Sequence, residues 1–403
     1  MAKASGIRKL SAESAEFDAS RDPFARDSIE HLVGRYGSPL FLIDADRVRT
    51  QFRRLSAALP GVELIYAVKC LPLPSVVGTL RDAGASFDLA TNGEVELVRR
   101  LGVAPGRCIH THPIKRDGDI RTALDFGVKH FVVDNPDELR KFVKFRNRAA
   151  LLIRIAFRSS DALVDLSRKF GCDADAVEGL LELAAELRIR VDGLSFHAGS
   201  QAAGPQKHVE AVRVCRGLFA SARLRGHELS ILDIGGGFPV DYMRGPTPIP
   251  IEEFCAPIRR ELGTLDSGVR VIAEPGRYLA APAAVVVASV MGRAQRDGHW
   301  WYYLDDGLYG SYSGQVFDRT KYPLEALVAP GPTYPSVLAG PTCDSVDVIS
   351  ENIALPKLKQ GDLVVGRVMG AYTWASASEF NFFPKTTVLA LDRGRLVREG
   401  GAR

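Results

Sequence analysis

The fold is decided by residues 176–236, which read AVEGLLELAAELRIRVDGLSFHAGSQAAGPQKHVEAVRVCRGLFASARLRGHELSILDIGG. In its first part, Val177, Leu180, Leu181 and Ala184 recur at the spacing of one helical face, and a second apolar stripe runs over residues 208–226. VDGLSFH and ILDIGG are short apolar runs typical of buried strands. The stretch therefore predicts helices that alternate with strands.

Working outward from this stretch, apolar runs of the same kind recur about every 30 residues, which is the length of a strand with its helix. They are ELIYAV (63–68), GASFDLA (84–90), RCIHTH (107–112), HFVVD (130–134), ALLIRI (150–155), VDGLSFH (191–197), ILDIGG (231–236) and VRVIAE (269–274). Eight strands alternating with helices predict an α/β fold with a (β/α)8 barrel over residues 38–275. A doubly wound open sheet has the same periodicity, so the pattern alone leaves that alternative open.

After Pro275 the pattern changes to short apolar or alternating runs separated by Gly and Pro. Examples are AAVVVASVMG (283–292), WWYYLDDG (300–307), DLVVGRVMGAY (362–372) and TTVLALDRG (386–394). These runs predict a second, mainly antiparallel β domain. We assign residues 1–37 and 276–403 to it, with PLFLID (39–44) as a further piece that it could take up.

Composition excludes several classes of protein. The 403 residues are 46% hydrophobic and 25% charged, as in an ordinary globular protein, and the net charge of +4 gives no case for nucleic acid or an anionic membrane. The mean hydropathy is −0.01, and the apolar stretch near residues 280–290 is too short to span a bilayer. The first residues have no signal-peptide pattern, and the six cysteines form no CxxC pair and no metal-binding spacing. We expect a cytoplasmic enzyme with reduced thiols and no metal.

Polar residues and glycines follow several of the predicted strands, at the end where a barrel enzyme carries its site. They are Lys69, Asp88, Arg154, His197, Gly235, Gly236, Gly237, Glu274 and Arg277. Each has an ordinary explanation when taken alone: such a lysine is usually a surface cation, such a histidine is usually packed in the core, and three glycines often make only a tight turn. Their joint position on one rim favours a functional site.

Together these residues have the chemistry of a pyridoxal phosphate site. The three glycines leave backbone N–H groups open to a phosphate, and Arg277 would add a charge-assisted contact. The apolar strand before Lys69 would desolvate the amine and lower its pKa, as a lysine that forms a Schiff base requires. Glu274 would keep a heteroaromatic nitrogen protonated, and His197 would stack on a flat ring.

Five motifs, in this order, resemble those of the fold-type III pyridoxal phosphate decarboxylases, and most closely those of the ornithine decarboxylase and bacterial lysine/ornithine decarboxylase group. They are YAVK (66–69), SFHAGS (195–200), DIGGGFP (233–239), EPGRY (274–278) and GPTCDSVD (340–347). The resemblance covers nearly the whole chain, from about Pro39 to Pro384. It implies an alanine-racemase-type barrel followed by a β domain, in a head-to-tail homodimer with shared active sites.

The resemblance also implies a role for each matched residue of the barrel. Lys69 would carry the cofactor, Glu274 would pair with its pyridine nitrogen and His197 would stack on its ring, while Asp88 and Glu94 would support lysine and cofactor. Further cofactor contacts would come from Arg154, Ser200, Gly235, Gly236, Gly237, Gly276, Arg277 and Tyr372.

In the β domain, the matched residues would reach the pocket of the neighbouring subunit or line its mouth. Cys343 matches the cysteine that returns a proton to the α-carbon after carbon dioxide leaves. Asp318 and Asp344 match carboxylates that bind the distal ammonium of a diamino acid. Phe380 matches an aromatic residue near the substrate, and Phe317, beside Asp318, stands where a tyrosine is usual.

Two further matches concern closure and assembly. Residues 159–169, SSDALVDLSRK, resemble a loop that closes over the site. Lys169 and Asp347 match an ion pair between subunits.

Two acidic side chains near the substrate's tail favour a cationic tail and repel a second carboxylate. Diaminopimelate decarboxylases usually carry Cys-Glu where this chain has Cys343-Asp344. We therefore expect decarboxylation of an L-diamino acid, first of all L-ornithine to putrescine. L-lysine, or both substrates, is the alternative, because one methylene is worth only about 1–3 kcal/mol. Diaminopimelate and arginine are less favoured substrates. Phe317, Arg319 and Trp374 differ from the residues usual in ornithine decarboxylases, and these differences would change the size or direction of the pocket for the substrate's tail.

Two other kinds of protein share this fold. A non-catalytic regulator should have lost part of the lysine, phosphate or cysteine set, and this chain retains all of it. An amino-acid racemase would need an acid/base pair on opposite faces of the cofactor, and it should lack the aspartates for a distal amine. The sequence therefore favours a decarboxylase over both.

Overall fold

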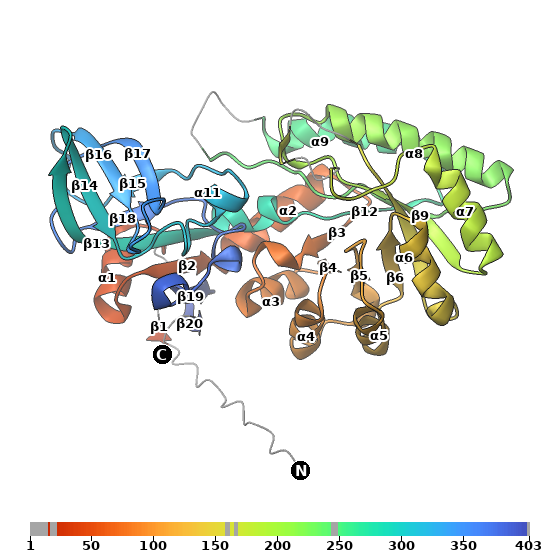
Figure 1. The fold of residues 1–403 in the computed structure, drawn as a ribbon, viewed down its shortest axis with the longest axis horizontal. Coiled ribbons are helices and arrows are strands. Elements are labelled where there is room, and N and C mark those ends of the chain that lie inside the picture. The colour runs from red at the N-terminus through yellow and green to blue at the C-terminus, as the bar shows by residue number, and fades with distance from the viewer. Residues whose placement is uncertain (1–14, 17–21, 158–161, 165–167, 243–248, 401–403) are drawn as a thin grey trace, which may run out of the picture.

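The computed structural model of the protein describes residues 15–16, 22–157, 162–164, 168–242 and 249–400. A closed barrel lies at one end of the molecule and a twisted sheet at the other (Figure 1). The loop that we predict to close over the site, residues 159–169, lies largely outside the described residues.

All eight predicted strands belong to the barrel. In chain order they are β3 (Val62–Ala67), β4 (Ser86–Leu89), β5 (Cys108–His110), β6 (His130–Val133), β7 (Ala150–Ile155), β9 (Arg190–Phe196), β11 (Ile231–Asp233) and β12 (Arg270–Ala273). Each strand pairs in parallel with the next one around the ring, and β12 closes the ring on β3. The barrel is therefore confirmed, and the doubly wound open sheet is excluded.

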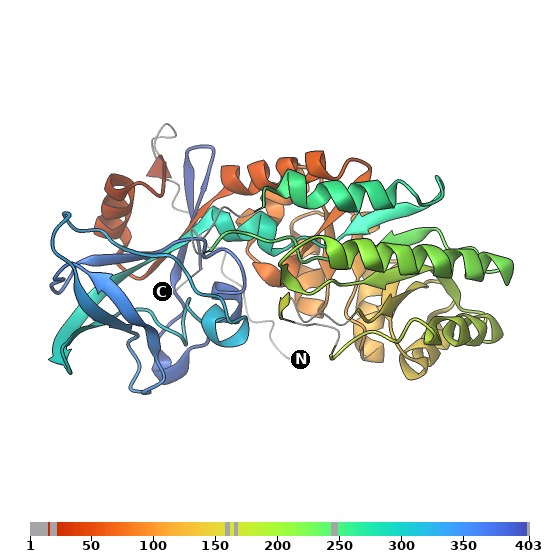
Figure 2. The ribbon, with the colours of Figure 1, turned by 90° about the horizontal axis from the view of Figure 1, so that it is seen from above.

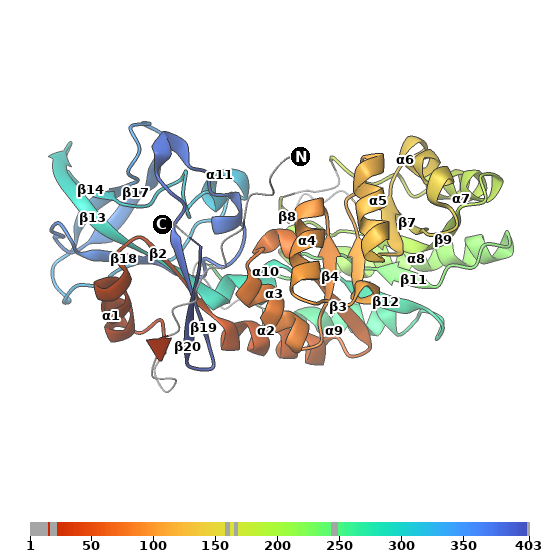
Figure 3. The same ribbon diagram turned by 90° about the horizontal axis from the view of Figure 1, so that it is seen from below.

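Helices surround the barrel, as the alternation predicts. They are α2 (Ala45–Ala58), α3 (Pro74–Asp82), α4 (Asn92–Arg100), α5 (Asp117–Phe126), α6 (Pro136–Lys141), α7 (Ala176–Glu186), α8 (Gln206–Leu224) and α9 (Ile251–Leu262). On α7, the predicted apolar face of Val177, Leu180, Leu181 and Ala184 is buried. Seen from below, α3 to α6 follow one another along the outside of the barrel (Figure 3). Among the described residues, no helix combines the length and the apolar character needed to cross a bilayer.

The second domain is built on a ten-stranded, mostly antiparallel sheet. Its strands are β1 (Ala15–Glu16), β2 (Leu40–Asp44), β13 (Ala284–Arg296), β14 (His299–Leu304), β15 (Leu324–Ala326), β16 (Tyr334–Ala339), β17 (Val348–Leu355), β18 (Leu363–Gly366), β19 (Thr387–Asp392) and β20 (Arg395–Gly400). Helix α1 (Arg26–Tyr36) packs on this sheet through Ile29 and Leu32. Figure 2 shows the sheet beside the helices of the barrel.

The structure differs from the predicted division of the chain at one strand. β2 lies inside the range 38–275 that we assign to the barrel, yet it pairs with β13 and β19 of the second sheet. The physical reason is that all five of its residues are buried, so the run needs partners on both edges and cover on both faces. Barrel elements therefore begin with α2, directly after this strand.

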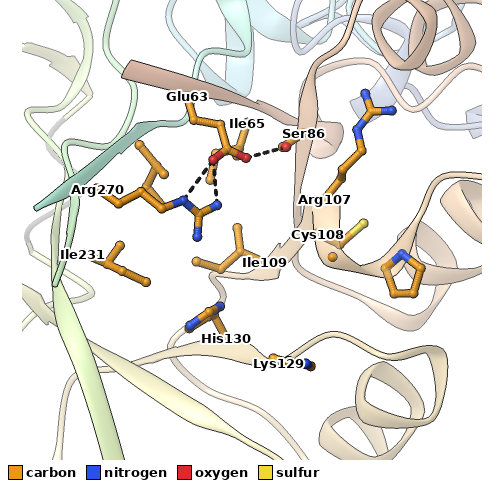
Figure 4. Close-up of a pocket in the computed structure, with 13 residues that line it drawn as sticks. Glu63, Ile65, Ser86, Arg107, Cys108, Ile109, Lys129, His130, Ile231 and Arg270 are labelled. Carbon is orange, nitrogen blue, oxygen red and sulfur yellow. Dashed lines mark hydrogen bonds and ion pairs between the residues drawn. The ribbon is translucent and has the colours of Figure 1, made fainter. Parts of the chain in front are cut away.

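A pocket lies at the amino ends of the barrel strands (Figure 4). Ile65, Ile109 and Ile231 are 2–6% exposed and pack against one another inside the barrel. At the mouth, both Nε and Nη2 of Arg270 donate to Glu63, at 3.0 and 2.6 Å, so these two charges are paired. In a barrel enzyme this end contributes stability and the opposite end carries the chemistry.

Replacement of Ile109 by alanine tests this assignment. We expect Ile109→Ala to lower the free energy of unfolding by about 2–5 kcal/mol, because it leaves a cavity in the barrel interior. Leu224→Ala, at an 89% exposed residue at the end of α8, should change it by less than about 0.5 kcal/mol. Urea unfolding followed by circular dichroism measures both, and equal losses would contradict the packing described here.

Candidate active site

A cavity at the carboxyl ends of the barrel strands brings together most of the predicted cofactor residues. Those that line it are Lys69, Arg154, His197, Ser200, Gly236, Gly237, Glu274, Gly276, Arg277 and Tyr372. The sequence analysis missed other residues of the lining: Ala90, Thr111, His112, Pro113, Phe170, Gln201 and Phe238. Most of these follow strands in the same way, and a search of every strand end would have found them.

The order of the strands places Lys69 between two carboxylates. β3 lies between β12 and β4 in the barrel. Lys69 follows β3 directly, Asp88 is in β4, and Glu274 follows β12. The Lys69 Nζ donates to Asp88 Oδ2 at 2.6 Å, and the other oxygen of Asp88 accepts from the hydroxyl of Thr111. The Asp88 side chain is fully buried, whereas that of Lys69 is 45% exposed and opens into the cavity.

The predicted lowering of the Lys69 pKa is wrong. Burial by itself does lower the pKa of this amine, but the carboxylates of Asp88 and Glu274 outweigh it and raise the pKa above its ordinary value. The sequence-based argument considered the strand that carries Lys69 and left out the two neighbouring strands. The free amine of Lys69 is therefore more basic than an ordinary lysine side chain.

Glu274 shares its buried position with Asp233, a second carboxylate that the sequence analysis did not single out. Burial, followed by the charges of Asp233 and Asp88, raises the pKa of Glu274 well above its usual range. Asp233 Oδ1 accepts from the Gly235 N–H at 2.9 Å, and a side-chain hydrogen bond links Asp233 to Glu274. Burial raises the pKa of Asp233 as well, to about 6, so both carboxyl groups bind a proton more readily than usual. The alternation of side chains along the strand could have identified Asp233. It lies two residues after the inward-facing Ile231, so its side chain also points into the barrel.

His197 presents a flat, neutral ring to the cavity. Its Nδ1 accepts from the Gly199 N–H at 3.0 Å, which fixes the orientation of the ring. Burial, and then the charges of Arg154 and Lys69, lower the pKa of His197 well below its usual value. A methyl group on Gly236 would lie 3.1 Å from Nε2, so the ring is next to the glycine turn.

The glycine turn after β11 has no room for side chains. A Cβ on Gly236 would lie 2.7 Å from the carbonyl oxygen of Glu274. Gly235 and Gly237 have φ values of +63° and +102°, which favour glycine. The backbone of the turn can therefore approach a bound group closely, as a phosphate cradle requires.

Arg277 lies beside this turn and is almost completely buried. Its Nη1 donates to the Tyr242 hydroxyl at 2.7 Å, and its Nη2 donates to Ser200 Oγ at 2.8 Å and to the carboxylate of Asp318. Its Nε is buried and has no hydrogen-bond partner in the described part of the chain. A buried donor without an acceptor is rare and indicates that a group from outside the chain supplies one.

These observations test whether the residues fit pyridoxal phosphate, and they do. The side-chain-free turn, Ser200 and the unpaired Nε of Arg277 suit the phosphate. The amine of Lys69 suits the aldehyde, the carboxylate pair at Glu274 suits a protonated ring nitrogen, and His197 suits the ring face.

Three other predicted residues, Glu94, Tyr372 and Gly276, are fixed by contacts with neighbouring backbone or side chains. Glu94 accepts from the Ala90 N–H at 2.5 Å at the start of α4, and burial raises the pKa of Glu94 to about 7, but it does not line the cavity. Tyr372 donates its N–H to the Cys70 carbonyl at 3.1 Å, and a Cβ on Gly276 would lie 2.9 Å from that of Cys70. Both lining residues are therefore anchored next to the segment that holds Lys69.

The predicted substrate residues of the second domain do not line the cavity of their own chain. Cys343 is exposed, and Phe317 is 69% exposed. Phe380 stacks on Tyr309 with ring centroids 4.3 Å apart, and the Tyr309 hydroxyl donates to Asp344. Cys343, Asp344, Phe317 and Phe380 therefore lie outside the cavity of their own chain, and their action in a neighbouring subunit stays a prediction.

Asp318 and Asp347 are already engaged within the chain. Asp318 pairs with Arg277 and accepts from Thr320 Oγ1 at 3.1 Å. Asp347 is 2% exposed, and its carboxylate accepts from the Leu308 N–H and the Thr342 hydroxyl, each at 2.7 Å. An ion pair between Asp347 and Lys169 of a second subunit would have to compete with these bonds.

Comparison with known proteins gives one consistent result. Solved structures of lysine/ornithine decarboxylase from Vibrio vulnificus, complexed with putrescine and with cadaverine, are 53% and 54% identical to this chain. The two structures superpose on this chain with TM-scores of 0.87 and 0.86. The matched region covers 91% and 90% of this chain and 98% and 97% of the two solved chains.

Two curated proteins match over similar lengths. Lysine/ornithine decarboxylase of Selenomonas ruminantium is 36% identical over 91% of this chain and 93% of its own. Antizyme inhibitor 2 of Xenopus laevis is 35% identical over 93% of this chain and 87% of its own. The family model described as pyridoxal-dependent decarboxylase, pyridoxal binding domain, matches residues 45–281. The chain therefore belongs to the family of pyridoxal-dependent decarboxylases, which use pyridoxal phosphate as their cofactor.

Proposed function

We propose that the protein decarboxylates L-ornithine to putrescine and accepts L-lysine as a second substrate. The observation that carries the proposal is the amine of Lys69 held between Asp88 and Glu274, next to a phosphate cradle. The similarity to lysine/ornithine decarboxylases whose structures contain putrescine and cadaverine supports both substrates. A difference of one methylene in the tail is too small to exclude either of them.

Pyridoxal phosphate, when bound, supplies an electron sink for the electrons that decarboxylation releases. The residues of this chain prepare the site for it. Lys69 would bind it covalently, and the Asp88 oxygen 2.6 Å from Nζ would orient the amine. Glu274, hydrogen-bonded to Asp233, would face the ring nitrogen. His197 would hold the ring in its plane.

The residues of the second domain would complete the site of a partner in a homodimer. Asp344 is the candidate for the distal ammonium, because the hydrogen bond from Tyr309 lowers the pKa of Asp344 and keeps it ionised. Cys343 is the candidate for returning a proton to the α-carbon, and Phe380 would lie beside the substrate. All six cysteines are free, which agrees with a reducing compartment such as the cytoplasm.

Carbon dioxide release from a panel of amino acids tests the proposed function. With added pyridoxal phosphate, kcat/KM should be highest for L-ornithine, with L-lysine within about 200-fold of it. Diaminopimelate should react far more slowly, because Asp344 repels its second carboxylate. No release from any of these amino acids would contradict the proposal and would instead favour a non-catalytic relative.

The role of Asp344 is tested by Asp344→Asn. Loss of the negative charge should lower kcat/KM for L-ornithine by about tenfold or more, mainly through KM, because a charge-assisted hydrogen bond to the tail is lost. Asp27→Asn removes an exposed carboxylate from α1 of the same domain and should have no effect. Equal kinetics for the two variants would remove Asp344 from the tail pocket.

The phosphate cradle is tested by Ser200→Ala. Titration of the apoprotein should show pyridoxal phosphate binding roughly two- to tenfold more weakly, since a hydrogen bond contributes ~0.5–1.5 kcal/mol. Pyridoxal, which has no phosphate, should bind as well as it does to the unaltered protein, and Ser56→Ala on α2 should change neither affinity. If both ligands weaken equally, Ser200 does not contact the phosphate.

A further inference from the structure

We propose that Asn381 is a positioning residue for Cys343: its side-chain amide holds the cysteine thiol in one orientation on the surface of the second domain. The role of the thiol as a proton donor rests on the proposed function. The way in which the thiol is held is argued from contacts between described residues. No motif of the sequence analysis includes Asn381.

The amide oxygen of Asn381 accepts two hydrogen bonds from one residue. The backbone N–H of Cys343 donates to Oδ1 at 3.3 Å, and the Cys343 thiol donates to the same oxygen at 3.3 Å. Because a backbone N–H can only donate, it determines which end of the amide faces the cysteine. The sulfur therefore meets a hydrogen-bond acceptor, and the S–H group points toward the Asn381 amide.

The backbone at Asn381 is shaped for this contact. Asn381 has φ 54° and ψ 22°, in the left-handed region that asparagine tolerates better than most residues. Phe382 follows with φ 61° and a side chain that is 98% exposed, so packing of its ring does not explain the conformation. Two consecutive left-handed residues form the turn from which the Asn381 amide reaches Cys343.

A second link joins the same two segments. Phe380, next to Asn381, stacks on Tyr309 with an angle of 23° between the rings. The Tyr309 hydroxyl donates to Asp344, next to Cys343. The segments 343–344 and 380–381 are thus connected twice, so the thiol has a defined place relative to the candidate tail carboxylate and the candidate substrate aromatic.

This arrangement suits a proton donor. Cys343 is exposed in the chain, whereas the other five cysteines are buried or half-buried. An exposed thiol without a partner would populate several χ1 rotamers. Asn381 selects one of these orientations, from which the thiol would deliver its proton to the substrate carbon.

Two variants of Asn381 and one control distinguish the effect of the side-chain amide from the effect of the backbone conformation. Asn381→Gly keeps the left-handed conformation without strain and removes the acceptor. Asn381→Asp keeps both the acceptor oxygen and the tolerance for this conformation. Asn147→Gly changes an exposed asparagine of the barrel and serves as the matched control.

The first measurement does not depend on catalysis. We expect iodoacetamide to alkylate Cys343 at least threefold faster in full-length apoprotein carrying Asn381→Gly than in the unaltered protein, because the sulfur is no longer held against the amide and is more accessible to the reagent. Asn381→Asp should react no faster than the unaltered protein, and Asn147→Gly should react at the same rate. Mass spectrometry of the Cys343 peptide measures the rates, and equal rates for Asn381→Gly and the unaltered protein would overturn the proposal.

The second measurement concerns turnover. Asn381→Gly should lower kcat for L-ornithine at least fivefold with little change in KM, and Asn381→Asp should retain most of the kcat. Faster alkylation with an unchanged kcat would also overturn the proposal, because the amide would then hold a thiol that turnover does not use. Absence of turnover in the unaltered protein would instead refute the proposed function, and the alkylation rates would still report on the contact.

Discussion

A charged amine between two carboxylates at the ends of adjacent strands is the interaction on which the rest of the site depends. Glu274, Lys69 and Asp88 come from β12, β3 and β4, which are neighbours in the closed barrel. Because Asp88 is fully buried, loss of its partner would leave an uncompensated charge at a cost of several kcal/mol. The position of the amine is therefore determined by barrel closure, and the glycine turn and Arg277 are placed around it by β11 and β12.

Three charged or titratable groups of the site have partners within the chain. Lys69 pairs with Asp88, Arg277 pairs with Asp318, and Glu274 is hydrogen-bonded to Asp233. An aldehyde, a phosphate and a ring nitrogen would each interact with one of these three pairs. The pairs thus make the site complementary to the charges of pyridoxal phosphate.

Sequence periodicity was sufficient for the eight strands, their helices and the rim of polar residues, because strand spacing and strand-end position are local properties of the chain. It did not decide between a closed barrel and an open sheet. The position of β2 was harder to predict, since a fully buried strand fits either sheet. The raised pKa of Lys69 and the engagement of Asp318 depend on side chains from other elements of the fold. The contact between Cys343 and Asn381 joins residues 38 positions apart, and only the folded chain shows it.

The most direct test of the central claim is to find where pyridoxal phosphate becomes attached. The holoprotein is reduced with borohydride, digested and analysed by mass spectrometry for a pyridoxyl-lysine. The account predicts one modified peptide, with the label on Lys69. A label on another lysine, or none in a protein that has taken up the cofactor, would contradict it.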